Sequence, residues 1–159
     1  MSVLKIKKFR DPVLRKKAEE VNKIDQKFVD DLAETMIKKD GIGLAAPQVG
    51  VSKRIIAVAN PQKEGVLVLV NPKIIKKRKE KELGEEGCLS FPGIFLKIKR
   101  AKKVEIEALN RNNEKIRFKA EGLAARVFQH ETDHLKGILF FHRLSPLKRI
   151  LFKMRHPLL

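Results

Sequence analysis

With 159 residues, the chain is long enough to bury a hydrophobic core, and we expect residues 1–159 to form one domain. Its 36 lysine and arginine residues against 19 acidic ones give a charge of +17, which favours polyanionic neighbours, but no sequence-specific nucleic-acid module is recognised. One cysteine excludes an internal disulfide, and neither a membrane-spanning run nor room for a signal sequence is found, so we expect a cytoplasmic protein with no membrane partner.

Two helices are predicted in the first quarter of the chain. Asp11 as N-cap and Pro12 at the first helical position predict a short helix through about Lys17. After Asp25, apolar residues recur with a period close to that of a helix, and Gly41 is expected to stop this second helix.

The segment that follows, GIGLAAPQVG at residues 41–50, is rich in small residues. Its glycines would let the backbone approach a ligand closely, but the lysine of a phosphate-binding loop is missing. Taken alone, the segment predicts a tight turn before a strand at Ile55–Ala59.

The middle of the chain predicts strands and exposed connections. Residues 60–65 form a hairpin-like connection into the apolar run Val66–Val70, a buried strand that Asn71 and Pro72 are expected to end. Residues 76–82 are charged and are expected to be exposed.

The sequence EEGCLSFPG surrounds the one cysteine. Gly87 frees the backbone beside Cys88, and Pro92 with Gly93 predicts a turn that closes the segment. A lone cysteine is usually a small buried side chain, so the reactivity of Cys88 depends on what lies near it.

The last third of the chain predicts a hairpin, a short strand and a helix. Val104–Leu109 and Lys115–Lys119 alternate apolar and charged residues, with a loop at residues 110–113. Ile138–Phe141 predicts a short strand. After Ser145, a terminal helix is predicted to be both amphipathic and basic.

Residues 130–134, HETDH, carry the strongest chemical signal. On a helix, His130 and His134 lie one turn apart on the stripe that includes Val127, so both can bind one metal ion beside the general base Glu131. Two histidines on an apolar stripe can also be core residues, but burying them with a carboxylate and no metal would leave polar groups unsatisfied. Cys88, if it lies near them, would be a third ligand and leave one position open for water, as in catalytic sites.

Three separated segments together resemble the signature motifs of peptide deformylases. They are GIGLAAPQ at 41–48, EGCLS at 86–90 and QHETDH at 129–134, and the flanking sequences extend the resemblance over nearly the whole chain. The resemblance implies an α+β fold, a single compact domain with mainly antiparallel strands around a central metal-binding helix. It also implies removal of the formyl group from the N-formylmethionine of newly synthesised proteins, with release of formate.

At matching positions, the resemblance implies a role for each motif residue. Three side chains would bind the metal, one would act as general acid and base, two groups would hold the carbonyl oxygen, and three residues would contact the substrate backbone as in β-strand addition. In that order they are Cys88, His130 and His134; Glu131; Gln48 and the backbone N–H of Leu89; and Ile42, Gly43 and Gly87.

The resemblance further implies ferrous iron as the most active native metal, with zinc, nickel or cobalt able to occupy the site. A thiolate ligand suits iron or zinc, and an iron–thiolate centre should be sensitive to oxygen. Near the site, we expect Asp133 to accept from a ligand imidazole or to fix neighbouring backbone, and Glu86 to pair with Arg100.

The basic terminal helix suggests a partner. Because N-formylmethionyl nascent polypeptides emerge from the ribosome, this cationic helix could dock on ribosomal RNA near the exit. The alternative, that the helix serves to pack its apolar face on the body of the protein, could hold at the same time. The cations concerned are Lys148, Arg149, Lys153 and Arg155.

Two other functions remain open from residue types alone. A metallopeptidase also uses two histidines and a glutamate at this spacing, but it would not need Cys88 or the two paired segments. A noncatalytic RNA-binding protein could keep a structural metal, but it would need neither Glu131 nor Gln48.

Overall fold

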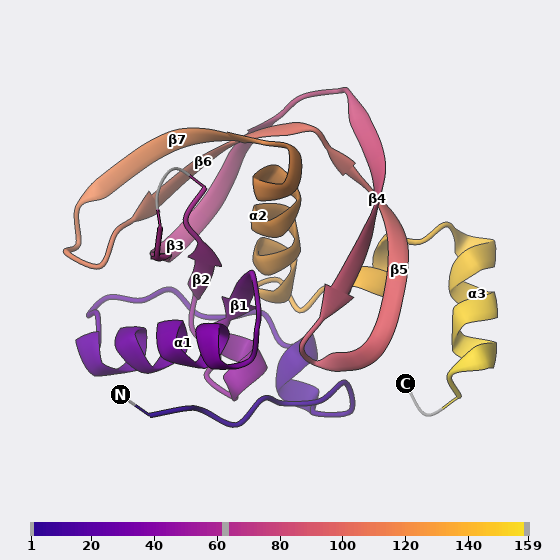
Figure 1. The fold of residues 1–159 in the computed structure, drawn as a ribbon, viewed down its shortest axis with the longest axis horizontal. Coiled ribbons are helices and arrows are strands. Elements are labelled where there is room, and N and C mark those ends of the chain that lie inside the picture. The colour runs from indigo at the N-terminus through magenta and orange to yellow at the C-terminus, as the bar shows by residue number, and fades with distance from the viewer. Residues whose placement is uncertain (1, 62–63, 158–159) are drawn as a thin grey trace.

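A computed structural model describes residues 2–61 and 64–157 of the chain. Helix α2 (Gly122–His134) lies at the centre, and the strands arch around it (Figure 1). Five antiparallel strands form one sheet in the order β1-β2-β3-β6-β7, and β4 and β5 form a separate hairpin. The predicted α+β fold, with mainly antiparallel strands around the metal-binding helix, is therefore confirmed. The strands are β1 (Gly43–Ala45), β2 (Ile55–Ala59), β3 (Val66–Lys77), β4 (Lys81–Cys88), β5 (Phe91–Ala101), β6 (Lys103–Leu109) and β7 (Lys115–Glu121).

Helix α2 is held in place by its apolar side. Ala125, Phe128 and the following Leu135 are buried in a cluster with residues of β2, β3 and β6. The helix begins at Gly122, whose φ of 56° marks the turn out of β7, and the chain leaves through Gly137 at φ 69°. Both are left-handed conformations that favour glycine.

Helix α1 (Gln26–Lys38) is capped as predicted, because the Asp25 side chain accepts a hydrogen bond from the N–H of Phe28. Its apolar stripe packs against β1, β2 and β3. The predicted stop at Gly41 is one residue late, since Asp40 adopts the left-handed conformation at φ 54°. The predicted first helix is a short 3₁₀ turn, η1 (Pro12–Arg15), with Asp11 accepting from the N–H of Val13.

Strand β3 does not end at Asn71 and Pro72, so the prediction of a short strand at 66–70 was wrong. The strand continues to Lys77 past an irregularity between Val70 and Lys73. Asn71 takes a positive φ of 51°, and its amide side chain pairs with the backbone of Val21. A bulge of this kind accommodates a proline without ending the strand.

The hairpin of β4 and β5 turns at Leu89 and Ser90, whereas Pro92 and Gly93 were predicted to form the turn. Cys88 lies opposite Phe91, so both predicted turn residues belong to β5. The turn is fixed by Phe91, which is 1% exposed and packs against Phe140 with ring centroids 5.1 Å apart.

Residues 138–141 were predicted as a strand, but a 3₁₀ turn, η3 (Phe140–Arg143), replaces it. Phe140 and Phe141 are buried around Phe91, which a flat strand could not achieve for two consecutive side chains. The N–H of Leu139 donates to Nδ1 of His142 and stabilises the turn.

Helix α3 (Pro146–Arg155) stands apart from the centre of the molecule, beyond β5 (Figure 1). Of its side chains, Phe152 is the one that is buried. The alternative that its apolar face packs on the body does not hold, because a stripe of four apolar side chains is exposed, namely Leu147, Ile150, Leu151 and Met154. In the described part of the chain, no helix has both the length and the apolar character needed to cross a membrane.

Candidate metal centre and substrate cleft

Helix α2 presents His130 and His134 on one face, as their spacing predicted. Their rings lie 5.0 Å apart between centroids, and their Nε2 atoms are separated by 3.3 Å. His134 is 1% exposed and His130 8% exposed. Burial lowers the pKa of His134 well below its ordinary value, so its imidazole is neutral and able to act as a metal ligand.

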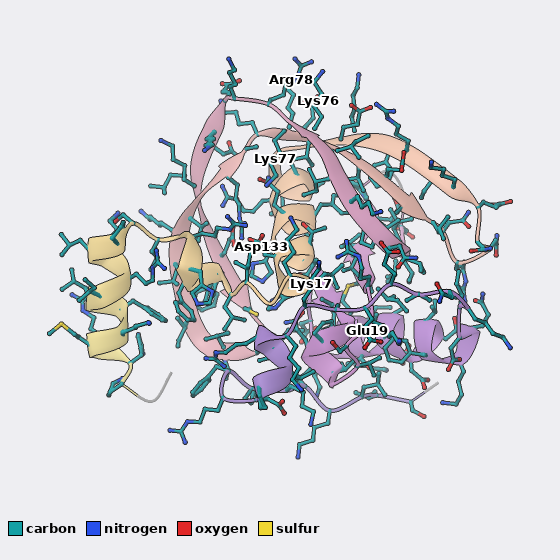
Figure 2. The ribbon with its side chains drawn as sticks, turned by 180° about the vertical axis from the view of Figure 1, so that it is seen from behind. Lys17, Glu19, Lys76, Lys77, Arg78 and Asp133 are labelled. Atoms are coloured by element: carbon teal, nitrogen blue, oxygen red, sulfur yellow. The ribbon has the colours of Figure 1, made fainter. Side chains whose placement is uncertain are left out.

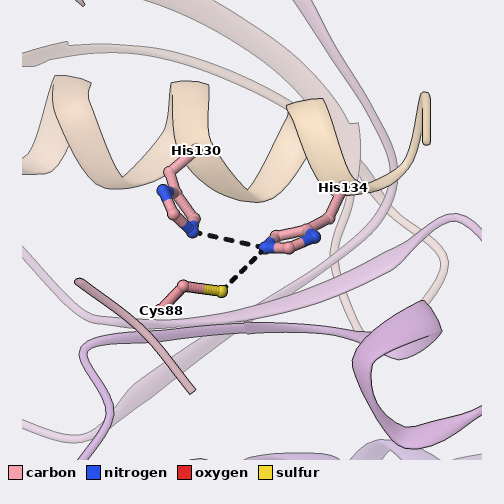
Figure 3. A group of neighbouring side chains, drawn as sticks. All are labelled: Cys88, His130 and His134. Atoms are coloured by element: carbon pink, nitrogen blue, oxygen red, sulfur yellow. Dashed lines mark hydrogen bonds between the residues drawn. The ribbon is translucent and has the colours of Figure 1, made fainter. Parts of the chain in front are cut away.

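Cys88 ends strand β4 and directs its thiol at the two imidazoles (Figure 3). Its Sγ lies 3.3 Å from Nε2 of His134, and one ligand atom from each of the three side chains falls within 4.8 Å of the others. Three donors this close and converging on one point suit a tetrahedral or five-coordinate cation with at least one open position. The structure thus brings together the three residues that were predicted as ligands.

Glu131 lies beside this group and is 4% exposed. Its Oε2 has no hydrogen-bond partner among the described residues, and burial raises the pKa of Glu131 to about 7. A carboxylate with a free oxygen and a pKa near neutrality is suited to accept and return a proton. Its other oxygen, Oε1, lies 2.4 Å from the position that a Cβ on Gly43 would take.

Gln48 approaches the same point from η2 (Ala46–Val49). Its Oε1 accepts from the N–H of Ala45 at 2.8 Å, which turns Nε2 toward Cys88 Sγ at 3.4 Å and Ser90 Oγ at 3.3 Å. The amide is 1% exposed, so its orientation is fixed by these contacts. It can therefore act as a hydrogen-bond donor toward the ligand group.

A cleft of about 530 Å³ opens above the group. The predicted substrate residues Ile42, Gly43 and Gly87 line it, as does Leu89, whose N–H was predicted to hold the carbonyl oxygen. Val127 lines it as well. Gly87 lies under the ring of Phe95, and Leu89 faces Gly41. Eight of the nine predicted site residues thus line one cleft. The ninth, His134, is buried behind them, with its Nε2 3.3 Å from Cys88 Sγ and from Nε2 of His130.

Comparison with known proteins identifies the family to which this arrangement belongs. Residues 3–150 match the profile of the family described as "Polypeptide deformylase". A peptide deformylase of Thermodesulfovibrio yellowstonii is 48% identical, over 98% of this chain and 97% of its own length. This chain belongs to the polypeptide deformylase family.

Solved deformylase structures share the fold as well as the sequence. The crystal structure from Thermotoga maritima has a TM-score of 0.87 at 45% identity and covers 92% of this chain and 100% of its own. The structure from Thermus thermophilus has a TM-score of 0.92 at 39% identity and covers 98% of this chain and 93% of its own. Removal of N-formyl groups from nascent peptides, the activity of the family, is accordingly the activity of this chain.

Behind the deformylase ligands lies an ionic network that the sequence revealed only in part. Glu86 was predicted to pair with Arg100, and it does so through both carboxylate oxygens, at 2.8 and 3.0 Å. Glu86 also contacts Nδ1 of His130 at 2.9 Å, which fixes the orientation of that ring. Burial alone would raise the pKa of Glu86, but Arg100 and His130 outweigh it and lower the pKa to about 2.

Asp133 does not contact an imidazole, so that part of the prediction was wrong. Its carboxylate is held by Arg100 at 2.5 Å and by Arg143 at 2.5 and 2.9 Å. Figure 2 shows Asp133 from behind the molecule, on the rear side of α2. Asp133 therefore supports Arg100, which in turn supports Glu86.

Arg126 and Gln129 were missed, although both occur in α2 within one turn of His130. Arg126 is 6% exposed, and its Nη1 donates to Glu86 at 2.9 Å and to the carbonyl of Ile98 at 2.8 Å. The amide of Gln129 pairs with the backbone of Ala101. Both residues tie the helix that carries two ligands to the hairpin that carries the third. An arginine on the apolar side of a helix was the sequence signal that could have revealed these contacts between α2 and the hairpin.

The network predicts a pH-dependent contribution of Glu86 to stability. Its pKa is lower in the folded state than the ordinary 4.5, so its stabilising effect is complete above pH 4.5 and is lost as the pH falls toward 2. Glu86→Gln should lower the free energy of unfolding of the metal-free protein by roughly 3 kcal/mol at pH 7. Urea unfolding of both proteins between pH 7 and pH 2 measures this. A difference that does not shrink at acidic pH would contradict the assignment.

Proposed function

We propose that this protein hydrolyses the formyl amide of N-formylmethionyl chains at the Cys88, His130 and His134 centre, and that residues 1–159 act as one catalytic domain. The observation that carries this mechanism is the convergence of three metal-ligand atoms beside a buried glutamate with a free oxygen. In support, the cleft above them is open to solvent and is large enough for a methionine side chain.

The ligand set fits a single divalent cation. The Nε2 atoms of His130 and His134 lie 3.3 Å apart, and the thiol of Cys88 lies 3.3 Å from Nε2 of His134. Without a cation between them, the lone pairs of these three donors repel one another or lack a partner. A cation held there would lower the pKa of water so that hydroxide exists near neutral pH, and would polarise the formyl carbonyl.

The protein's own groups supply the remaining chemistry. Glu131 takes a proton from the attacking water and later gives it to the leaving amine, so that formate and a free amino terminus result. Nε2 of Gln48 and the backbone N–H of Leu89 donate to the carbonyl oxygen as negative charge develops on it. The position of Gln48, whose Oε1 is already occupied by Ala45, supports this role for Nε2.

Ferrous iron is our proposal for the metal in the cell, because a site with one thiolate and two imidazoles suits iron or zinc and the family resemblance implies iron. Zinc, nickel or cobalt would also fit these donors. The iron-loaded protein should lose activity in air as iron and Cys88 oxidise, while the zinc-loaded protein should not. Equal loss of activity in air by both forms would argue against iron.

The substrate backbone is proposed to lie between β1 and β4, where Ile42, Gly43 and Gly87 can pair with it as an added strand. Gly43→Ala tests this arrangement, because a Cβ there would collide with Oε1 of Glu131 and with Val127. We expect kcat/KM to fall at least about 100-fold with metal content unchanged. Ile42→Ala is the control, since its side chain is 51% exposed and the proposed contact is through the backbone. A fully active Gly43→Ala would contradict the placement.

Turnover of a short formyl-methionyl peptide tests the proposed function as a whole. The protein is purified with ferrous iron without oxygen, and products are followed by mass. Formate and the unformylated peptide are the expected products, whereas an internal cut would identify a peptidase and an untouched peptide would favour a binding protein.

We also propose that the protein works in the cytoplasm and docks on the ribosome through α3. The exposed apolar stripe of α3 and its exposed cations Lys148, Lys153 and Arg155 support a role in contact with a partner, whereas Arg149 is partly buried. Reversing the charge of Lys148, Arg149, Lys153 and Arg155 should abolish co-sedimentation with ribosomes at low salt and leave turnover of short peptides unchanged. Undiminished co-sedimentation would remove this partner.

A further inference from the structure

A second hollow lies between β5 and α3, beside the substrate cleft. It encloses about 470 Å³ and is lined by residues 93–97 of β5 and by side chains from the C-terminal segment. Gly93, Ile94 and Phe95 line both the hollow and the cleft. The hollow, which we call the distal groove, therefore borders the cleft along the first half of β5. Its C-terminal wall consists of Leu144, Lys148, Leu151, Phe152, Arg155 and His156.

The distal groove combines apolar surface with positive charge. Leucine and phenylalanine side chains form much of its wall, and Lys97, Lys148 and Arg155 add three cations, while none of the described residues that line it carries a carboxylate. Within residues 2–61 and 64–157, none of these three cations forms an ion pair. A ligand that carries both acidic and apolar groups would complement this surface.

We propose that the distal groove binds the part of the polypeptide substrate that lies beyond the formylmethionine, and that it favours segments with acidic and apolar side chains. The proposal rests on the proposed deformylase mechanism. When the formyl end reaches the ligand group at the bottom of the cleft, the rest of the polypeptide must leave over the rim. Phe95, 64% exposed, stands at the rim that the cleft and the groove share.

The backbone of β5 can contribute to this binding. In the described structure, β5 pairs with β4 along one edge only, and α3 stands on the side of β5 away from β4 (Figure 1). A free strand edge can add a further extended segment. A second copy of this chain fits the groove less well, because two chains of charge +17 repel each other.

The test uses two formyl-methionyl peptides of about ten residues, which span roughly 30 Å when extended. They share their first three residues and differ beyond them, where one is rich in Glu and Leu and the other in Lys and Leu. The wild-type protein at low salt should show a kcat/KM about tenfold higher for the acidic peptide, mainly through KM. A triple variant, the groove variant, carries Lys97→Glu, Lys148→Glu and Arg155→Glu together and should remove or invert this preference. The triple variant with Gln at the same three positions should reduce it.

A matched control reverses the same amount of charge elsewhere. Lys76 at the end of β3 and Arg78 in the turn to β4 lie well separated from α3 in the rear view of Figure 2, and Lys79 follows Arg78 in the same turn. Replacing them with Glu should leave the preference for the acidic peptide intact. If this control loses the preference as much as the groove variant does, net charge alone explains it and the proposal is overturned.

Two further measurements keep the result interpretable. A formyl-methionyl dipeptide amide is too short to reach the distal groove, so all variants should turn it over equally, which also reports correct folding. If the wild-type protein fails on this short substrate, the proposed mechanism itself is contradicted. If the groove variant keeps its preference for the acidic peptide but loses ribosome co-sedimentation, the groove serves a ribosomal partner and the substrate proposal is overturned.

Discussion

Replacing Glu131 with Gln should lower kcat/KM for a formyl-methionyl peptide by about 1,000-fold while the metal stays bound. The amide keeps the shape of the side chain but cannot take a proton from water or return it to the leaving amine, and such proton transfers contribute roughly 10²–10⁴-fold to enzymatic rates. Glu131 is not among the three grouped ligand donors, so metal content should not change. Steady-state kinetics and elemental analysis of the same preparation measure both quantities.

The Glu131→Gln variant should also fold at least as well as the wild type. The wild-type carboxylate is 4% exposed with one oxygen unpartnered, so replacing it with a neutral amide removes a buried charge rather than a stabilising contact. Retention of more than about a tenth of the activity would contradict the role of Glu131 as general acid and base.

Replacing Cys88 with Ala should remove most of the bound metal and, with it, the activity. Cys88 supplies the one thiolate, and the two imidazoles alone are a weaker ligand set for iron or zinc. After dialysis, we expect metal content to fall below about one tenth of the wild-type value and kcat/KM to fall at least about 1,000-fold. Inductively coupled plasma mass spectrometry and peptide turnover measure the two effects.

Folding must be checked separately for this variant. The Cys88 side chain is only partly buried, so the metal-free forms of wild type and variant should unfold at similar urea concentrations. Leu123→Ala, at a cleft residue that is 65% exposed, serves as a control that should keep its metal. A Cys88→Ala variant that retains stoichiometric metal after dialysis would exclude the thiolate as a ligand.

The parts of the fold that were predicted are those with a clear apolar period. The stripe of α1, the spacing of His130 and His134, and the alternation in β6 and β7 each depend on local geometry that repeats along the chain. These elements were recognisable because burial on one side imposes the period directly on the sequence.

The β4–β5 hairpin was not predicted as two strands because the less exposed positions, which alternate along both strands, do not all carry apolar residues. Glu86 and Arg100 occupy buried positions that apolar residues would normally take, since they satisfy each other and His130. Likewise, Asn71 and Pro72 are signals for a strand end that the bulge in β3 overrides. In both places, tertiary contacts outweigh local preference.

The residues of the site were predictable from the sequence, but the contacts that hold them in place were not. The spacing of the histidines defines two ligands, whereas the approach of Cys88 depends on how the hairpin packs against α2. Arg126 and Gln129 fix that packing through hydrogen bonds to backbone carbonyls, which leave no pattern in the sequence. The exposure of the apolar stripe of α3 could not be predicted from the sequence either, because amphipathic character does not tell which face of the helix contacts the rest of the protein.

X-ray absorption of the zinc-loaded protein tests the central claim, that two distant segments build one metal centre, most directly. The claim predicts one sulfur ligand at about 2.3 Å and two imidazole nitrogens at about 2.0–2.1 Å, with the remaining coordination from a light atom. A spectrum from the wild-type protein with no sulfur ligand, or with only one imidazole, would contradict the account.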